Sequence, residues 1–202
     1  MYLKELFSTP VWADSLDQVS DQDILSIQKY CLEQARTADS HQYSNQGGFH
    51  SEAYSVEQLK DTPLSVLLDL ITDKVNECMF NLGSDKKLRL SSIWFHVNGP
   101  GNYNSIHAHG GVLSGSFYVA VPDNESSIFF SRALDMTNYF YGSIGCKNIT
   151  DITASEFDFK PSPKAIVVFP SWLPHGVRPN QSNLERISIS FNTEITNEQT
   201  TI

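Results

Sequence analysis

Three histidines in this chain have the residue type and spacing of a metal site. His107 and His109 lie two residues apart, and on an extended chain two such side chains point to the same face. Both imidazoles can therefore reach one cation. His175 follows His109 by 66 residues, a separation that excludes a local zinc finger. It fits a barrel in which distant strands bring their ends together.

A fourth candidate, Arg186, follows His175 by 11 residues, which is enough for a turn and a strand reversal. Strand alternation puts Arg186 and Ser188 on one face, and the neighbouring Glu185 points the opposite way. A buried guanidinium needs an anionic partner. A bound dicarboxylate, held by the guanidinium and the Ser188 hydroxyl, would supply one. The alternative is a surface arginine on an edge strand.

The other three histidines have no further potential metal ligand at such a spacing. We expect His41 and His50 at the surface and His96 at the wall of a pocket. Residues 43–51 are polar, aromatic and rich in glycine. They form either a surface loop or a loop that closes over a pocket.

The first part of the chain is predicted to be helical. Ser20 can cap a helix whose apolar residues recur at helical spacing. A second helix is predicted with Thr62 as its N-cap, Pro63 at its first position and Gly83 at its end. We expect both helices to pack on the outside of a sheet and assign them no chemistry.

From residue 88 onward the pattern changes to short apolar or alternating runs separated by glycine, proline and asparagine. We predict strands over residues 88–97, 113–121, 127–130, 152–159, 165–169 and 187–191. Such a series indicates a mainly β fold with a double-stranded β-helix (jelly-roll) core and N-terminal flanking helices. We expect a single domain over residues 1–202, with helical support and a loop in 1–87, the jelly-roll core in 88–194 and a tail in 195–202.

Composition limits the setting in which the protein works. The 202 residues carry a formal net charge of −9, which disfavours nucleic acid as a partner. Cys31, Cys78 and Cys146 form no close pair, so we expect three thiols in a reducing compartment. No apolar run approaches the ~18 residues of a membrane span, and the N-terminus is unlike a signal peptide. The prediction is a cytoplasmic protein.

Several segments, taken in order, resemble a group of 2-oxoglutarate- and Fe(II)-dependent oxygenases from bacteria and phages. The group has a His-x-His segment before a Leu-Ser-Gly-x-Tyr-Tyr-like strand. The matching segments here are residues 6–11, 47–51, 98–101, 107–119, 169–175 and 185–192. The resemblance therefore extends over most of the chain, and the motifs are specific as an ordered set.

The resemblance implies a function and roles for the residues. His107 and His175 would be the first and last ligands of Fe(II), and Arg186 would hold the far carboxylate of 2-oxoglutarate. Tyr118 and Asn98 lie where related oxygenases place contacts to that co-substrate. With O2, such an enzyme decarboxylates 2-oxoglutarate to succinate and hydroxylates a substrate, which the sequence does not identify.

The chain departs from the wider superfamily at His109. The usual residue there is Asp or Glu, which completes a site of two histidines and one carboxylate. Three neutral imidazoles can still hold a divalent first-row metal. In the alternative, His109 is not a ligand and a carboxylate such as Asp123 takes its place.

Two other function classes stay open at this point. A cupin-like metal-binding protein or enzyme that does not use 2-oxoglutarate would share the His-x-His segment, but cupins add a glutamate where this chain has Leu113 and Ser114. A non-enzymatic jelly-roll module with incidental histidines is the other. The sequence is compatible with a homo-oligomer and does not specify one.

Overall fold

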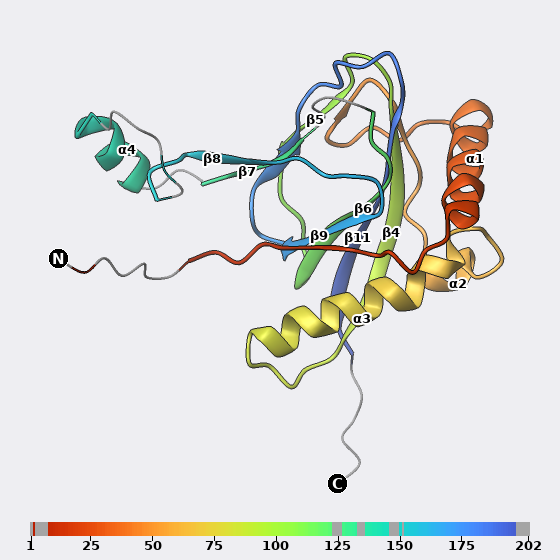
Figure 1. Ribbon diagram of the computed structural model, residues 1–202, viewed down its shortest axis with the longest axis horizontal. Helices are drawn as coiled ribbons and strands as arrows, with labels where there is room; N and C mark the ends of the chain where they lie inside the picture. Colours follow the sequence, from red (N-terminus) through yellow and green to blue (C-terminus); the bar gives the residue numbers. More distant parts are fainter. Residues whose placement is uncertain are drawn as a thin grey trace, which may run out of the picture.

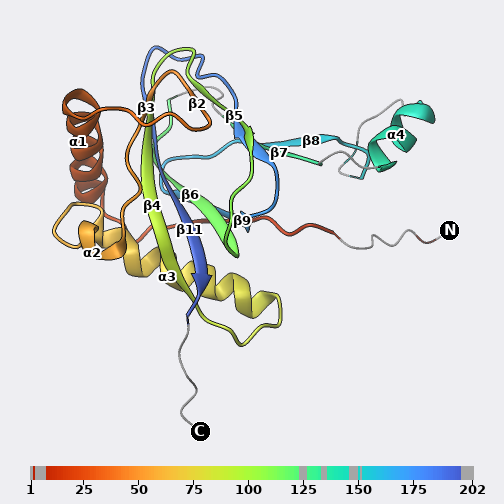
Figure 2. The ribbon, with the colours of Figure 1, turned by 180° about the vertical axis from the view of Figure 1, so that it is seen from behind.

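The computed structural model describes residues 2, 8–122, 127–132, 136–145, 150 and 152–196. Its chain forms two antiparallel sheets, with helices gathered against one of them (Figures 1 and 2). The elements are β1 (Trp12–Ser15), α1 (Asp21–Thr37), β2 (Asn45–Gln46), β3 (Phe49–His50), α2 (Val56–Leu59), α3 (Ser65–Asn81), β4 (Leu88–Asn98), β5 (Tyr103–His107), β6 (Leu113–Ala120), β7 (Ile128–Ser131), α4 (Met136–Ser143), β8 (Glu156–Phe159), β9 (Ala165–Pro170), β10 (His175–Val177) and β11 (Arg186–Ile195).

The strand order is that of a jelly roll. The larger sheet runs β1-β9-β6-β11-β4-β3 and the smaller sheet runs β2-β5-β10-β7-β8. From β4 to β11 the chain passes repeatedly from one sheet to the other, and the paired strands are antiparallel. This topology confirms the predicted fold class.

The helices begin and end close to the predicted residues. The Ser20 hydroxyl accepts a hydrogen bond from the Asp23 amide at 3.1 Å, so Ser20 caps α1 as predicted. The prediction for the second helix was two residues early, because α3 begins at Ser65. The Thr62 hydroxyl instead accepts from the Leu64 amide at 3.2 Å in the turn before it. Gly83 follows the helix with a φ of +74°, as a C-terminal stop requires.

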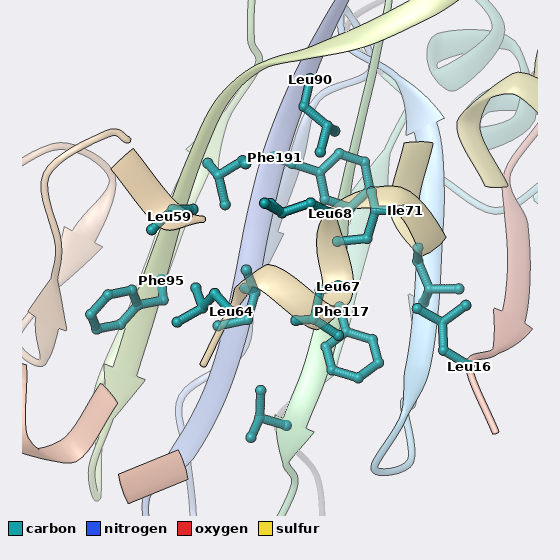
Figure 3. Close-up of a cluster of buried hydrophobic side chains, with 14 of the residues drawn as sticks. Leu16, Leu59, Leu64, Leu67, Leu68, Ile71, Leu90, Phe95, Phe117 and Phe191 are labelled. Carbon is teal, nitrogen blue, oxygen red and sulfur yellow. The ribbon is translucent and has the colours of Figure 1, made fainter. Parts of the chain in front are cut away.

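The apolar core lies between the helices and the outer face of the larger sheet. In Figure 3, Leu64, which precedes α3, and Leu67 and Ile71 of α3 lie toward Phe117 and Phe191 of the sheet. These five side chains are at most 1% exposed. Full burial of one such side chain contributes about 1.5–3 kcal/mol, so this layer stabilises the sheet that carries the candidate site on its other face.

The helix α4 extends away from the barrel, at the far end of β7 and β8 (Figure 1). β7 itself belongs to the smaller sheet, where it pairs with β10. Cys31 and Cys78 are buried free thiols, whereas Cys146 lies outside the described residues. In the part of the chain that the structure describes, no helix has the length and hydropathy needed to cross a bilayer.

Candidate metal centre

The structure brings the three predicted histidines together at the ends of two neighbouring strands. His107 is the last residue of β5 and His175 the first of β10, and the two are paired across the small sheet. His109 lies just beyond β5, where its amide donates to the Ser171 carbonyl at 2.9 Å. The atoms through which the three could bind a metal all lie within 4.8 Å of one another.

Backbone carbonyls orient two of the three imidazoles. Nδ1 of His107 lies 2.7 Å from the Ser105 carbonyl oxygen, and Nδ1 of His175 lies 2.8 Å from that of Leu173. A carbonyl only accepts, so each Nδ1 carries the proton and each Nε2 keeps its lone pair for a metal. Among the described residues His109 has no such hydrogen bond, and its ring packs against Trp94 at 5.4 Å between centroids.

All three imidazoles are neutral in the metal-free protein. Burial, together with the charge of His107, lowers the pKa of His109 to about 4 and that of His175 to about 3. Burial also lowers the pKa of His107. Because a histidine must be deprotonated to bind a metal, the site is in its metal-binding form at neutral pH.

The donor set fits a divalent first-row metal. Three nitrogen donors leave coordination positions open, and imidazole suits iron as well as zinc, copper and nickel. The potential ligands that cluster here in the described part of the chain are all histidines. Asp123, the alternative ligand, lies outside the described residues. The three ligands are neutral, so a bound cation would keep its full positive charge for an anionic co-ligand.

Arg186, the residue predicted to bind the co-substrate, lies in the same pocket. Arg186 is 2% exposed, at the first position of β11, and shares the pocket lining with the three histidines, Ser188 and Tyr118. Burial lowers the pKa of Arg186, but a guanidinium stays charged in proteins even so. Burial raises the pKa of Tyr118 to about 12, so its phenol stays protonated at neutral pH. Arg186 is therefore a buried arginine, and the surface alternative is wrong.

Asn98 lies next to this group without lining the pocket. It is paired with Arg186 across β4 and β11, and its amide donates to the Asn104 side chain at 3.1 Å. The pocket has room for the centres of about two or three water molecules, in a volume of about 30 Å³.

Sequence inspection missed much of the pocket wall. The additional lining residues include Trp94, Asn104 and Ser116, beside the anticipated His96. The signal was present in the alternation of the two strands, because Trp94 pairs with Ser190 and His96 with Ser188 across β4 and β11. Once Arg186 is placed on the inner face of one strand, the residues that pair with its same-face neighbours are expected on the inner face of the adjacent strand.

Residues 43–51 are not the surface loop that was one of the two expectations. They supply β2 to the small sheet and β3 to the large one, and so they line one edge of both. His50 is only 6% exposed and stacks on Trp94, so its predicted surface position is wrong. His41 is exposed, as expected.

Comparison with known families gives one match. The model of a family described as "Putative 2OG-Fe(II) oxygenase" matches residues 92–192. This range contains the three histidines, Arg186 and the strands that carry them. No curated protein matches the chain in sequence.

Solved structures share the fold at low sequence identity. A Pseudomonas putida prolyl-4-hydroxylase is 15% identical, with 92% of this chain and 93% of that one covered and a TM-score of 0.60. A viral collagen prolyl hydroxylase from Paramecium Bursaria Chlorella virus-1, in complex with 2OG, is 12% identical over 91% and 94% of the chains, with a TM-score of 0.58. HygX from Streptomyces hygroscopicus, with nickel and 2-oxoglutarate bound, is 10% identical over 94% and 84%, with a TM-score of 0.62.

Proposed function

Since the chain belongs to the 2OG-Fe(II) oxygenase family, we propose that His107, His109 and His175 hold its Fe(II) and that Arg186 anchors its 2-oxoglutarate. As a member of this family it is a 2-oxoglutarate- and Fe(II)-dependent oxygenase, which takes O2 as its other co-substrate. The family match decides against the cupin-like alternative, which does not use 2-oxoglutarate.

One observation supports this assignment more than any other. Three neutral imidazoles and one buried guanidinium line the same pocket, although they come from three different strands and the turn after β5. A divalent cation at the imidazoles would keep both of its positive charges, and the guanidinium adds a third to the same cavity. A dianion that can chelate a metal at one end and accept hydrogen bonds at the other matches that arrangement.

The residues of the chain would bind and orient Fe(II) and 2-oxoglutarate and would exclude water from the pocket. Bound Fe(II), 2-oxoglutarate and O2 supply the oxidising chemistry, in which the keto acid is decarboxylated to succinate and carbon dioxide. His107 and His175 present Nε2 because carbonyls hold Nδ1–H. Arg186 and the Ser188 hydroxyl would donate to the far carboxylate, and the protonated Tyr118 phenol is a further donor beside them. The resemblance implies that Asn98 contacts the co-substrate, but Asn98 does not line the pocket, so we propose that it supports the site from its position opposite Arg186.

Other aspects of the function extend the family assignment. We propose that the oxidation is a hydroxylation and that the protein works in the cytoplasm, in accord with its buried thiols. The net charge of −9 favours a substrate other than nucleic acid. A homo-oligomer is compatible with this function, and the substrate is not assigned.

Anaerobic titration tests the proposed site. Adding 2-oxoglutarate to the Fe(II)-loaded protein should produce a weak visible charge-transfer band, and calorimetry should give matching stoichiometry. Changing His107 or His175 to Ala should abolish the band and weaken Mn(II) binding by more than about 100-fold. Even residues that only orient metal ligands commonly contribute 10- to 100-fold.

His41→Ala provides the matched control, because His41 is an exposed imidazole in the same protein. Its band and its Mn(II) affinity should equal those of the wild type. A band that persists in both His107→Ala and His175→Ala would refute this ligand set. For His109, a His109→Asp variant that keeps the band and a His109→Ala variant that loses it would support direct coordination.

A further inference from the structure

His96 lies between the candidate metal site and the guanidinium. It lies two residues before the end of β4, is 7% exposed, and faces Ser188 across the strand pair with Tyr118 beyond it. It lines the pocket together with the three clustered histidines and Arg186. A ligand that reaches from the imidazole cluster to Arg186 therefore occupies a pocket that the His96 ring also lines.

A hydrogen bond defines which nitrogen of His96 carries the proton. Nδ2 of Asn104, which can only donate, lies 3.3 Å from Nε2 of His96. The same Nδ2 donates to the Ser44 hydroxyl at 3.2 Å, and Oδ1 of Asn104 accepts from Asn98 at 3.1 Å. Nε2 of His96 must therefore accept, and in the neutral ring the proton is on Nδ1.

His96 also stays uncharged. Burial lowers its pKa well below the usual value, and the charges of His50 and Arg186 lower it further. In the described part of the chain Nδ1 of His96 has no hydrogen-bond partner, and the ring of His50 approaches edge-on at 4.5 Å between centroids. A neutral N–H without a partner is therefore present in a pocket whose other donors suit an anion.

We infer that His96 is a co-substrate-binding residue, whose Nδ1–H donates a hydrogen bond to an oxygen of the bound dicarboxylate between the metal and Arg186. This inference rests on the proposed function. A hydrogen bond to a charged acceptor is stronger than one between neutral groups. The Asn98–Asn104–His96 chain would hold the imidazole in the tautomer that donates into the pocket, so Asn104 acts as a positioning residue.

Two isosteric substitutions separate this role from simple packing. The amide of Asn can take the place of Nδ1, whereas the amide of Gln reaches the place of Nε2. His96→Asn should therefore keep a donor in the pocket, and His96→Gln should keep only the bond to Asn104. His96→Leu removes both, and Asn76→Ala, which loses a side chain between α3 and β4, is a control outside the pocket.

The measurements are the Kd of 2-oxoglutarate on the anaerobic Fe(II)-loaded variants and the Kd of Mn(II) alone. We expect His96→Gln and His96→Leu to weaken 2-oxoglutarate by roughly 10- to 100-fold, with Mn(II) binding unchanged and His96→Asn close to wild type. In ¹⁵N NMR of the metal-free protein, Nδ1 of His96 should be protonated and Nε2 should not.

Each outcome decides the inference. Wild-type affinity in His96→Leu, or equal losses in His96→Asn and His96→Gln, would overturn it. If His96→Leu does not fold, the Asn and Gln variants still give the answer. A protonated Nε2 would also contradict it. If the wild type itself binds no 2-oxoglutarate, the proposed function fails as well, which is distinct from failure at His96 alone.

Discussion

Along β11 the two faces of the larger sheet differ in chemistry although they share the same strand. On β11, Ile187, Ile189 and Phe191 face the helices and are at most 1% exposed. The alternate residues Arg186 and Ser188 face the interior of the barrel and are buried as well. Burial therefore does not distinguish the faces, and polarity does.

This difference separates stability from binding along a single strand. The outer face gains free energy by removing apolar area from water. The inner face buries a guanidinium, imidazoles and hydroxyls, which opposes folding unless they are hydrogen-bonded. Along β11, substitutions two residues apart should both affect stability or both affect binding. Substitutions at adjacent residues should differ in which of the two they affect.

The largest effect is expected at the outer face. Phe191→Ala removes a ring that is 0% exposed in the core of Figure 3, and should lower the free energy of unfolding by about 3–5 kcal/mol. Denaturant unfolding of the metal-free protein measures it. At a temperature where the variant is folded, its Mn(II) affinity should match the wild type. A loss of metal affinity in the folded variant would show that the two faces are coupled.

At the inner face, Arg186→Leu should spare stability and remove co-substrate binding. Truncating one partner of a buried, hydrogen-bonded charge pair costs about 2–5 kcal/mol, so the Kd of 2-oxoglutarate should rise by at least about 30-fold. Mn(II) binding should be unchanged. The matched control is Arg89→Leu, an exposed arginine paired with Glu194 on the same two strands. Equal effects from both variants would contradict the assignment.

Lowering the pH should destabilise the fold through the imidazoles that line the pocket. The pKa values of His109 and His175, about 4 and about 3, lie below the unfolded value of 6.5. The unfolded chain therefore binds protons more readily, so stability is highest above pH 6.5 and falls as the pH drops toward 4. We expect a loss of at least about 2 kcal/mol by pH 4. Urea unfolding of the metal-free protein at several pH values tests this, and His175→Gln should flatten the profile.

The smallest effect concerns the hydroxyls of the inner face. Oγ of Ser116 and Oγ of Ser190 lie 2.9 Å apart. Removing both in a Ser116→Ala/Ser190→Ala variant leaves no partner unsatisfied in that pair, so stability should change by less than about 1 kcal/mol. A larger loss on thermal unfolding would mean that polar groups of the inner face also hold the sheet together.

Patterns of period two made the chemistry of the strands predictable. Alternation correctly placed Arg186 and Ser188 on one face, and the spacing of His107 and His109 indicated that both lie near one point. The capping of α1 by Ser20 was also local and therefore readable from sequence.

Non-local pairing accounts for most of what was missed. β10 has three residues and β1 has four, too few for a periodic signal, and β5 is largely polar. The burial of His50 depends on β3 pairing with β4, which no short segment specifies. Asn104 lies in the pocket wall because β5 pairs with β10, a pairing that no short segment specifies.

The pairing of His107 with His175 has a consequence for biogenesis. The two residues are 68 positions apart in sequence but adjacent in the small sheet, and Arg186 follows later still. A nascent chain that has emerged only through β9 has no complete set of donors. Iron binding at the proposed site would therefore follow closure of the barrel. A bound ion would link β5 to β10 and should slow amide hydrogen exchange in both strands.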